Sequence, residues 1–138
     1  MKDSELLPYM AGLFDGEGSI HLSNKARNAT IVVTFTNTNL LLCQIFAAAW
    51  GGHISSAQPK NKNARRIYRW YRFGKTAVPF LKVIFSYSIG KKELAELAIQ
   101  YIEAGVGSGR SFSNAQIQRR QQLAEAIFNH QHKGHKPS

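Results

Sequence analysis

The chain has 138 residues, of which 43% are hydrophobic and 19% are charged. A chain of this length holds one domain with a sizeable core, and this composition excludes a disordered protein. The formal net charge of +10 makes a polyanion the first partner to consider.

Several classes of protein are excluded by what the sequence lacks. No stretch approaches eighteen consecutive apolar residues, which argues against a membrane span. Residues 1–9 show no apolar signal core, and the single Cys43 provides neither a disulfide framework nor the ligands of a zinc or iron–sulfur site. We therefore expect an intracellular protein, in a bacterial or phage-infected cytoplasm or in an organelle matrix or stroma, rather than a secreted one.

The alternation and periodicity of apolar residues predict an α+β fold. In chain order we predict a helix over 8–16, strands over 19–24 and 30–35, a helix over 40–50, strands over 53–58 and 67–73, and helices over 75–86, 92–103 and 114–129. Pro8 and Pro79 suit the first turns of their helices, and Gly51 ends the second helix. We expect a single domain over 1–129, with helices on one face of an antiparallel sheet, and a polar tail over 130–138.

The positive charge is distributed unevenly along this order. Residues 18–92 contain twelve Lys or Arg and no Asp or Glu. A surface that serves only solubility normally mixes both signs. The acid-free interval therefore predicts one continuous surface that faces phosphates.

Strand alternation predicts which side chains lie on the open face of the sheet. The core side receives Ile20, Leu22, Ile31, Val33, Phe35 and Ile54. The fourth strand is ambiguous, and we assign two of its three arginines, Arg66 and Arg72, to the open face, which leaves Arg69 on the core side. Hydroxyl, imidazole, guanidinium and aromatic groups can contact base edges and phosphates. The predicted contacts, from strands and turns, are Ser19, His21, Ser23, Lys25, Arg27, Thr34, Thr36, His53, Ser55, Lys60, Lys62, Arg66, Tyr68, Trp70 and Arg72.

Two carboxylates, Asp15 and Glu17, stand at the end of the first predicted helix, where the helix dipole disfavours negative charge. Gly12 and Gly16 lie on one face of that helix beside Ala11, which would let the same helix of a second copy approach closely. Two clustered Glu17 side chains would then require a hard cation such as Mg²⁺, and this combination indicates metal-assisted phosphodiester hydrolysis. The alternative interpretation is that Asp15 caps a turn and Glu17 is a solvent-exposed acid.

The segment MAGLFDGEG, residues 10–18, resembles the signature of the LAGLIDADG homing endonucleases in order and in residue type. The resemblance continues through FTNTN before a helix, WGGHI, a YRW strand and KKELAELAIQYI, and it covers roughly residues 7–103. It implies an αββαββα fold whose concave sheet sits on DNA and whose motif helix forms the subunit interface.

The resemblance also implies roles for individual residues. The acid at the eighth motif position binds the catalytic metal, and here this is Glu17, a Glu where the namesake motif has Asp. The backbone carbonyl of Gly16 would be a further metal ligand, and Asp15 would have a structural role at the helix end. The implied dimer interface comprises Ala11, Gly12, Asp15 and Gly16.

The resemblance implies two further catalytic roles, and for each role this sequence offers two candidate residues. A basic residue that stabilises transition-state charge corresponds to Lys91, with the adjacent Lys92 as a rival. A polar residue that organises solvent corresponds to Asn39 or Asn37, where Gln is commoner in the family. We select Asn39, although either Asn can equally be a helix cap.

Only one copy of the motif is present, so the chain resembles the homodimeric branch, which implies a near-palindromic DNA target. The expected cofactor is Mg²⁺ or Mn²⁺, with Ca²⁺ binding without supporting cleavage. The alternative function is a nucleic-acid binder that does not cleave, either an intron maturase or a degenerate endonuclease. A structural dimer whose basic face has no specific target is a further alternative.

Overall fold

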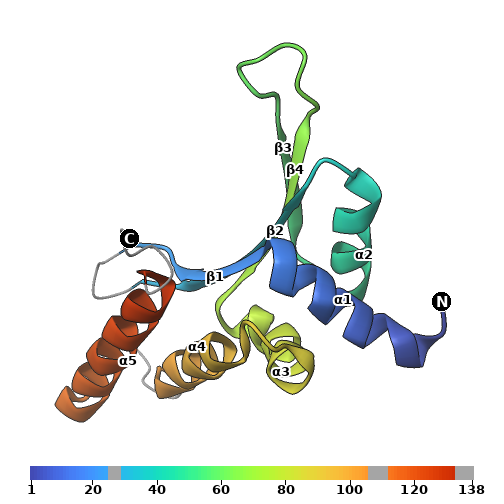
Figure 1. Ribbon diagram of the computed structural model, residues 1–138. Coiled ribbons are helices and arrows are strands. Elements are labelled where there is room, and N and C mark those ends of the chain that lie inside the picture. The colour runs from blue at the N-terminus through green and yellow to red at the C-terminus, as the bar shows by residue number, and fades with distance from the viewer. Residues whose placement is uncertain (25–28, 106–111, 133–138) are drawn as a thin grey trace, which may run out of the picture.

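A computed structural model describes residues 1–24, 29–105 and 112–132 (Figure 1). Its elements are α1 Asp3–Glu17, β1 Gly18–Leu22, β2 Ile31–Asn37, α2 Leu40–Trp50, β3 His53–Ala57, β4 Ile67–Phe73, the 3₁₀ turn η1 Gly74–Ala77, α3 Val78–Tyr87, α4 Lys92–Ala104 and α5 Asn114–His132. The order and kinds of these elements confirm the predicted α+β fold. Within the described ranges, no helix has the length and apolar character needed to cross a membrane.

The four strands form one antiparallel sheet in the order β1-β2-β4-β3. The pairing sets Gly18 opposite Phe35, Phe35 opposite Trp70, and Trp70 opposite Ile54. Figure 1 shows the helices gathered around one side of this sheet, while the β3–β4 hairpin extends beyond them. The opposite side of the sheet is open.

The core between sheet and helices is built on aromatic rings. Phe46 on α2 packs against Phe35, Trp70 and Phe80, at centroid distances of 4.4, 5.1 and 5.9 Å. The indole nitrogen of Trp70 donates to the carbonyl of Gly51 at 2.7 Å, so this buried polar group is satisfied. Large rings that are fully buried contribute strongly to the hydrophobic stabilisation of a small domain.

The face assignment is confirmed for three strands and wrong for the fourth. Ile20, Ile31, Val33 and Phe35 are fully buried as predicted. Trp70, however, has no exposed surface, because its register opposite Phe35 places it on the core side. The sequence-based choice gave the arginines more weight than the apolar volume of Trp70. The open face of β4 therefore consists of Ile67, Arg69, Tyr71 and Phe73.

The first helix is longer than predicted. It begins at Asp3, not at residue 8, and Pro8 lies in its interior. The amides of Glu5 and Leu6 donate to the carbonyl of Lys2 and start the helix one turn and a half earlier. Pro8 donates no hydrogen bond, but the turns on either side of it supply Leu6 and Met10 to the core. Tertiary packing here outweighs the preference of proline for a first helical position.

Most other boundaries agree with the prediction to within a few residues. α2 and β4 match it at both ends, and Pro79 lies in the first turn of α3. α5 runs to His132 instead of 129, so the start of the expected polar tail is helical. Lys25, Arg27 and most of the expected loop before α5 lie outside the described residues.

Candidate active site and nucleic-acid interface

The candidate active site lies where α1 ends. Glu17, the last residue of α1, is exposed, and no basic residue occupies the final turn of that helix. The side-chain amide of Asn37, the last residue of β2, donates to the Glu17 carboxylate. Of the residues that the structure describes, none forms an ion pair with Glu17. An exposed carboxylate without a cationic partner is available to a metal ion.

The two asparagines that the sequence could not separate have different partners. Asn39 is the N-cap of α2, since its side-chain oxygen accepts from the amide of Leu41 at 3.0 Å. The Asn37 side-chain oxygen accepts from the Asn39 amide at 2.8 Å, which orients its own amide group toward Glu17. The structure therefore shows Asn39 as a helix cap and places Asn37, the alternative candidate, against Glu17.

Asp15 ties the end of α1 to the connection between α3 and α4. Its carboxylate accepts from the Ser88 hydroxyl and from the amides of Ile89 at 3.0 Å and Gly90 at 3.4 Å. Burial alone would raise the pKa of Asp15, but these hydrogen bonds and the charge of Lys91 outweigh it and leave the pKa below its ordinary value. The carboxylate is therefore ionised, and its hydrogen bonds tie the end of α1 to the α3–α4 connection.

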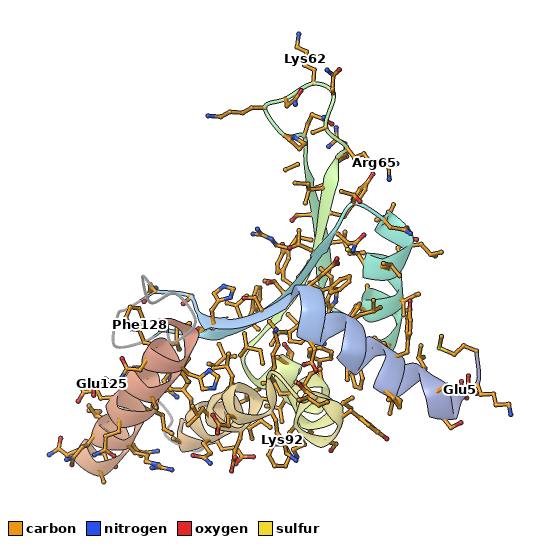
Figure 2. The ribbon with its side chains drawn as sticks, viewed as in Figure 1. Glu5, Lys62, Arg65, Lys92, Glu125 and Phe128 are labelled. Atoms are coloured by element: carbon orange, nitrogen blue, oxygen red, sulfur yellow. The ribbon has the colours of Figure 1, made fainter. Side chains whose placement is uncertain are left out.

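The two candidate lysines are separated clearly by their contacts. The ammonium group of Lys91 donates to the backbone carbonyl of Asp15 at 2.8 Å, at the end of α1 where the helix dipole favours a cation. The ammonium group of Lys92 lies 5.1 Å from the centre of the exposed Phe85 ring, and Figure 2 shows it beside the helices, away from the hairpin. The structure brings Lys91, and not Lys92, to the end of α1.

One face of α1 is open to a partner. A Cβ atom added to Gly12 or Gly16 would meet nothing within 4 Å, and both residues are exposed. Ala11, by contrast, is 1% exposed and packs in the core, so its assignment to a dimer interface is wrong. The Asp15 side chain points to the α3–α4 connection instead. The open face is therefore centred on the two glycines.

The donor set at this end of α1 suits a hard divalent cation. The Glu17 carboxylate and the Gly16 carbonyl are both oxygen ligands, the type that Mg²⁺ prefers. Across the described residues there is no group of three His, Cys, Asp or Glu side chains that could hold a metal alone. Mg²⁺ is commonly bound by one or two carboxylates together with phosphate oxygens, so one exposed carboxylate per chain fits a site completed by a substrate or a second chain.

No protein-family model matches the chain, and no curated protein sequence matches it. Solved structures do. The archaeal intron-encoded homing endonuclease I-Vdi141I, in complex with DNA, superposes with a TM-score of 0.75 at 17% identity, over 94% of this chain and 86% of that one. The homing endonuclease I-CvuI, in complex with its target in the presence of calcium, gives 0.73 at 14% identity over 93% and 83%. The LAGLIDADG homing endonuclease I-SmaMI, bound to cleaved DNA, gives 0.64 at 15% identity, over 95% of this chain but 49% of its own.

The chain has the LAGLIDADG homing endonuclease fold. It matches most of I-Vdi141I and of I-CvuI and about half of I-SmaMI, in agreement with the single copy of the motif. The motif segment 10–18 forms the second half of α1 and the first residue of β1, so Glu17 lies at the junction of helix and sheet.

The open sheet face of this LAGLIDADG fold combines polar and aromatic side chains. Ser19, His21, Thr36, His53 and Ser55 lie there as predicted, whereas Thr34 has the same strand parity but is buried. The register adds Arg69, Tyr71 and Phe73. The rings of Tyr71, His53 and Phe73 pack together with centroids 5.5 to 6.4 Å apart. The sequence-based prediction did not assign these β4 residues to the open face. Pairing β4 with β2, whose two faces were predicted correctly, would have placed them there.

His21 adds a neutral polar group to the same face. Burial, followed by the positive charge of Arg69, lowers the pKa of His21, so that at pH 7 the ring is uncharged. Ser19 lies within hydrogen-bond distance, with 2.9 Å between its hydroxyl and the Nδ1 atom of His21. The pair offers a donor and an acceptor to base edges.

Four of the predicted DNA contacts alternate along the chain with Arg69 and Tyr71, and they do not lie on the open face of the sheet. Trp70 is in the core, Tyr68 packs against the core, and the Arg72 guanidinium lies against the turn at Gly51. Arg66 donates to the Ser56 hydroxyl at 3.2 Å near the end of the hairpin. None of these four shares the open face with Arg69, so we correct their assignment to it.

The β3–β4 hairpin carries the exposed cations farthest from the core. Figure 2 shows Lys62 at its tip, well beyond the helices, and Arg65 below it on the same hairpin. Lys60 is exposed in the same turn, which is closed by the Ala64 amide donating to the Asn61 carbonyl at 3.0 Å. Exposed cations on a projecting turn suit contact with phosphates.

Proposed function

We propose that two copies of this chain form a homodimer that hydrolyses phosphodiester bonds of a long, near-palindromic DNA target with Mg²⁺ or Mn²⁺. One observation carries the proposal: an exposed carboxylate, Glu17, ends a helix whose glycine face is open, with Asn37 bonded to it and Lys91 bound to the same helix end. The fold supports it, since I-Vdi141I and I-CvuI with this fold are in complex with DNA.

The proposed dimer packs the two copies of α1 against each other. With no side chain at Gly12 or Gly16, the helix backbones can approach closely along this face. A two-fold axis there brings one Glu17 from each chain to the same region, which places two carboxylates at the proposed metal site.

Each residue at the end of α1 has a separate task in the proposed reaction. A divalent cation, when bound, stabilises charge on the phosphate and makes a water molecule more acidic. Glu17 and the Gly16 carbonyl would hold this cation, and Asn37 keeps the Glu17 carboxylate in one orientation. Lys91 supplies a fixed positive charge near the phosphate, and such a charge lowers the barrier most when it needs no rearrangement.

The sheet and the hairpin bind the DNA in this proposal. Polar groups on the open face, among them His21, Thr36 and Arg69, contact base edges, while Lys60 and Lys62 contact phosphates. The acid-free interval of residues 18–92 supports this division because no carboxylate on these elements repels the DNA backbone.

The test is cleavage of a plasmid library that contains palindromic and near-palindromic targets. The purified chain is incubated with Mg²⁺ or Mn²⁺ beside Glu17→Gln, and Glu5→Gln is the control because Glu5 lies at the other end of α1 (Figure 2). We expect a discrete subset of targets to be cut by the wild type and by Glu5→Gln. Glu17→Gln and added chelator abolish this cleavage. Specific binding without cleavage at either metal would refute nuclease activity and favour the maturase or degenerate endonuclease.

A further inference from the structure

Ser88 is a buried hydroxyl in the connection between α3 and α4, with 6% of its surface exposed. It is the C-cap of α3, and its amide donates to the carbonyl of Ile84 at 2.8 Å. A buried hydroxyl costs free energy unless it is hydrogen-bonded, so its partners show what it stabilises.

Both kinds of hydrogen bond that a hydroxyl can make are used here. The Ser88 hydroxyl donates to the Asp15 carboxylate and accepts from the amide of Lys91 at 2.8 Å. It therefore links Asp15, in the last turn of α1, to Lys91, the residue directly before α4. These two residues are more than seventy positions apart in the sequence.

Lys91 is thus bound at both of its ends. Its amide is bonded to Ser88, and its ammonium group donates to the Asp15 carbonyl at 2.8 Å. Asp15 is held in turn by Ser88, Ile89 and Gly90, and it lies two residues before Glu17. The position of the Lys91 charge relative to Glu17 depends on this closed set of bonds.

We infer that Ser88 is a positioning residue that fixes the Lys91 ammonium group at the active site through the Asp15 carboxylate and the Lys91 amide. This inference deepens the proposed endonuclease activity and rests on it. Ser88 acts on the reaction through Lys91 and Asp15, because its buried hydroxyl is bonded to both residues.

The test compares Ser88→Ala with Ser88→Thr, which keeps the hydroxyl. The control is Ser86→Ala, since Ser86 is exposed on the same helix and donates only to the Lys82 carbonyl at 3.0 Å. We expect Ser88→Ala to lower the single-turnover cleavage rate at saturating protein by roughly 100-fold, the effect of a misplacement of about 1 Å. The Kd for target DNA in Ca²⁺ stays within about 2-fold, because the DNA-binding face is unchanged. Ser88→Thr restores most of the rate, and Ser86→Ala has no effect.

A readout independent of cleavage is the exchange rate of the Lys91 amide hydrogen, measured by NMR. That amide donates to the Ser88 hydroxyl at 2.8 Å, so its exchange accelerates in Ser88→Ala but not in Ser88→Thr. This measurement separates the two proposals, because unchanged exchange overturns the role of Ser88 even where cleavage is observed. If the wild type cuts no target but the exchange accelerates in Ser88→Ala, the proposed function fails while the link from Ser88 to Lys91 stands.

Two results would overturn the inference directly. One is a Ser88→Ala rate equal to that of the wild type. The other is an equal loss of rate and DNA affinity that Ser88→Thr does not rescue, which indicates a purely structural role. Where Ser88→Ala does not fold, Ser88→Cys replaces it, since a thiol is close in shape but a weak donor. A wild-type rate in Ser88→Cys would then contradict the assignment.

Discussion

The end of α1 and the tip of the β3–β4 hairpin are both polar, but they are built in different ways. At the end of α1, hydrogen bonds join Asp15 to Ser88 and Lys91, which are far apart in the sequence, and Ser88 is buried. At the tip of the hairpin, bonds join neighbours such as Asn61 and Ala64, and Lys60 and Lys62 are exposed. Fixed geometry suits catalysis, whereas exposed cations suit phosphate binding.

This difference predicts that substitutions at the two regions separate cleavage from affinity. Changes at the end of α1 affect the cleavage rate and leave the Kd nearly unchanged. Changes in the hairpin affect the Kd and its salt dependence, and leave the rate at saturating protein nearly unchanged.

The largest effect is expected from Gly12→Leu. Outside its own stretch of helix, no atom of the same chain lies within 4 Å of a Cβ at this position, so the monomer folds, and loss of a helical glycine stabilises it by about 1 kcal/mol. The added side chain blocks the approach of the second α1 and abolishes cleavage. Sedimentation velocity should show a monomer with an unchanged melting profile; a cleaving dimer would contradict the proposed interface.

Lys91→Ala is expected to lower the cleavage rate by roughly 100- to 1,000-fold, because one fixed charge at the phosphate is lost. Lys92→Ala is the matched control, since Lys92 lies over Phe85 and away from the end of α1. Single-turnover assays on both variants decide the assignment. An equal loss in both variants would show that the two lysines act through general charge and not through position.

The double variant Lys60→Ala/Lys62→Ala is expected to weaken DNA binding without a change in the saturated cleavage rate. Each lysine that contacts a phosphate contributes close to one unit to the slope of log Kd against log salt concentration, and the proposed dimer carries two copies of each lysine, so the slope should fall by about four. Binding titrations at several salt concentrations measure this. An unchanged slope would mean that the hairpin tip does not contact the DNA backbone.

The smallest effect concerns stability and its dependence on pH. The pKa of Asp15 is lower in the folded chain than in the unfolded chain, so its carboxylate stabilises the fold above the ordinary pKa of 3.8. That stabilisation is lost as the pH falls through the lower, folded-state pKa. Asp15→Asn should lower the free energy of unfolding at pH 7 by about 1–3 kcal/mol. Urea titrations should show the difference shrinking in acid; a constant difference would exclude ionisation as its cause.

The sequence predicted most of the fold because its local signals agree with one another. Asn39 and Gly51 bound α2, and alternating apolar residues placed three strands correctly. Pro8 and Trp70 were misplaced because tertiary packing decided their positions: Pro8 lies in a helix that contributes Leu6 to the core, and Trp70 pairs with Phe35. Helix and strand propensities and the charge pattern are local properties, and they do not predict such tertiary contacts.

The candidate site was predictable only in part, for a similar reason. The motif identified Glu17 and Asp15 because their spacing is local. The choice between Asn37 and Asn39, and between Lys91 and Lys92, depended on which side chain reaches the end of α1. Ser88 carries no local signal, and its contact with Asp15 spans 73 positions.

The most direct test of the proposed dimer is cleavage of a supercoiled plasmid by mixed dimers of wild type and Glu17→Gln. The two chains carry different affinity tags so that heterodimers can be purified, and the plasmid contains a target that the wild type cuts. Because the proposed site takes one Glu17 from each chain, the heterodimer loses cleavage of both strands and leaves the plasmid supercoiled, whereas the wild-type homodimer produces linear DNA. Linear DNA from the heterodimer at the wild-type rate would contradict a shared site built from one carboxylate per chain.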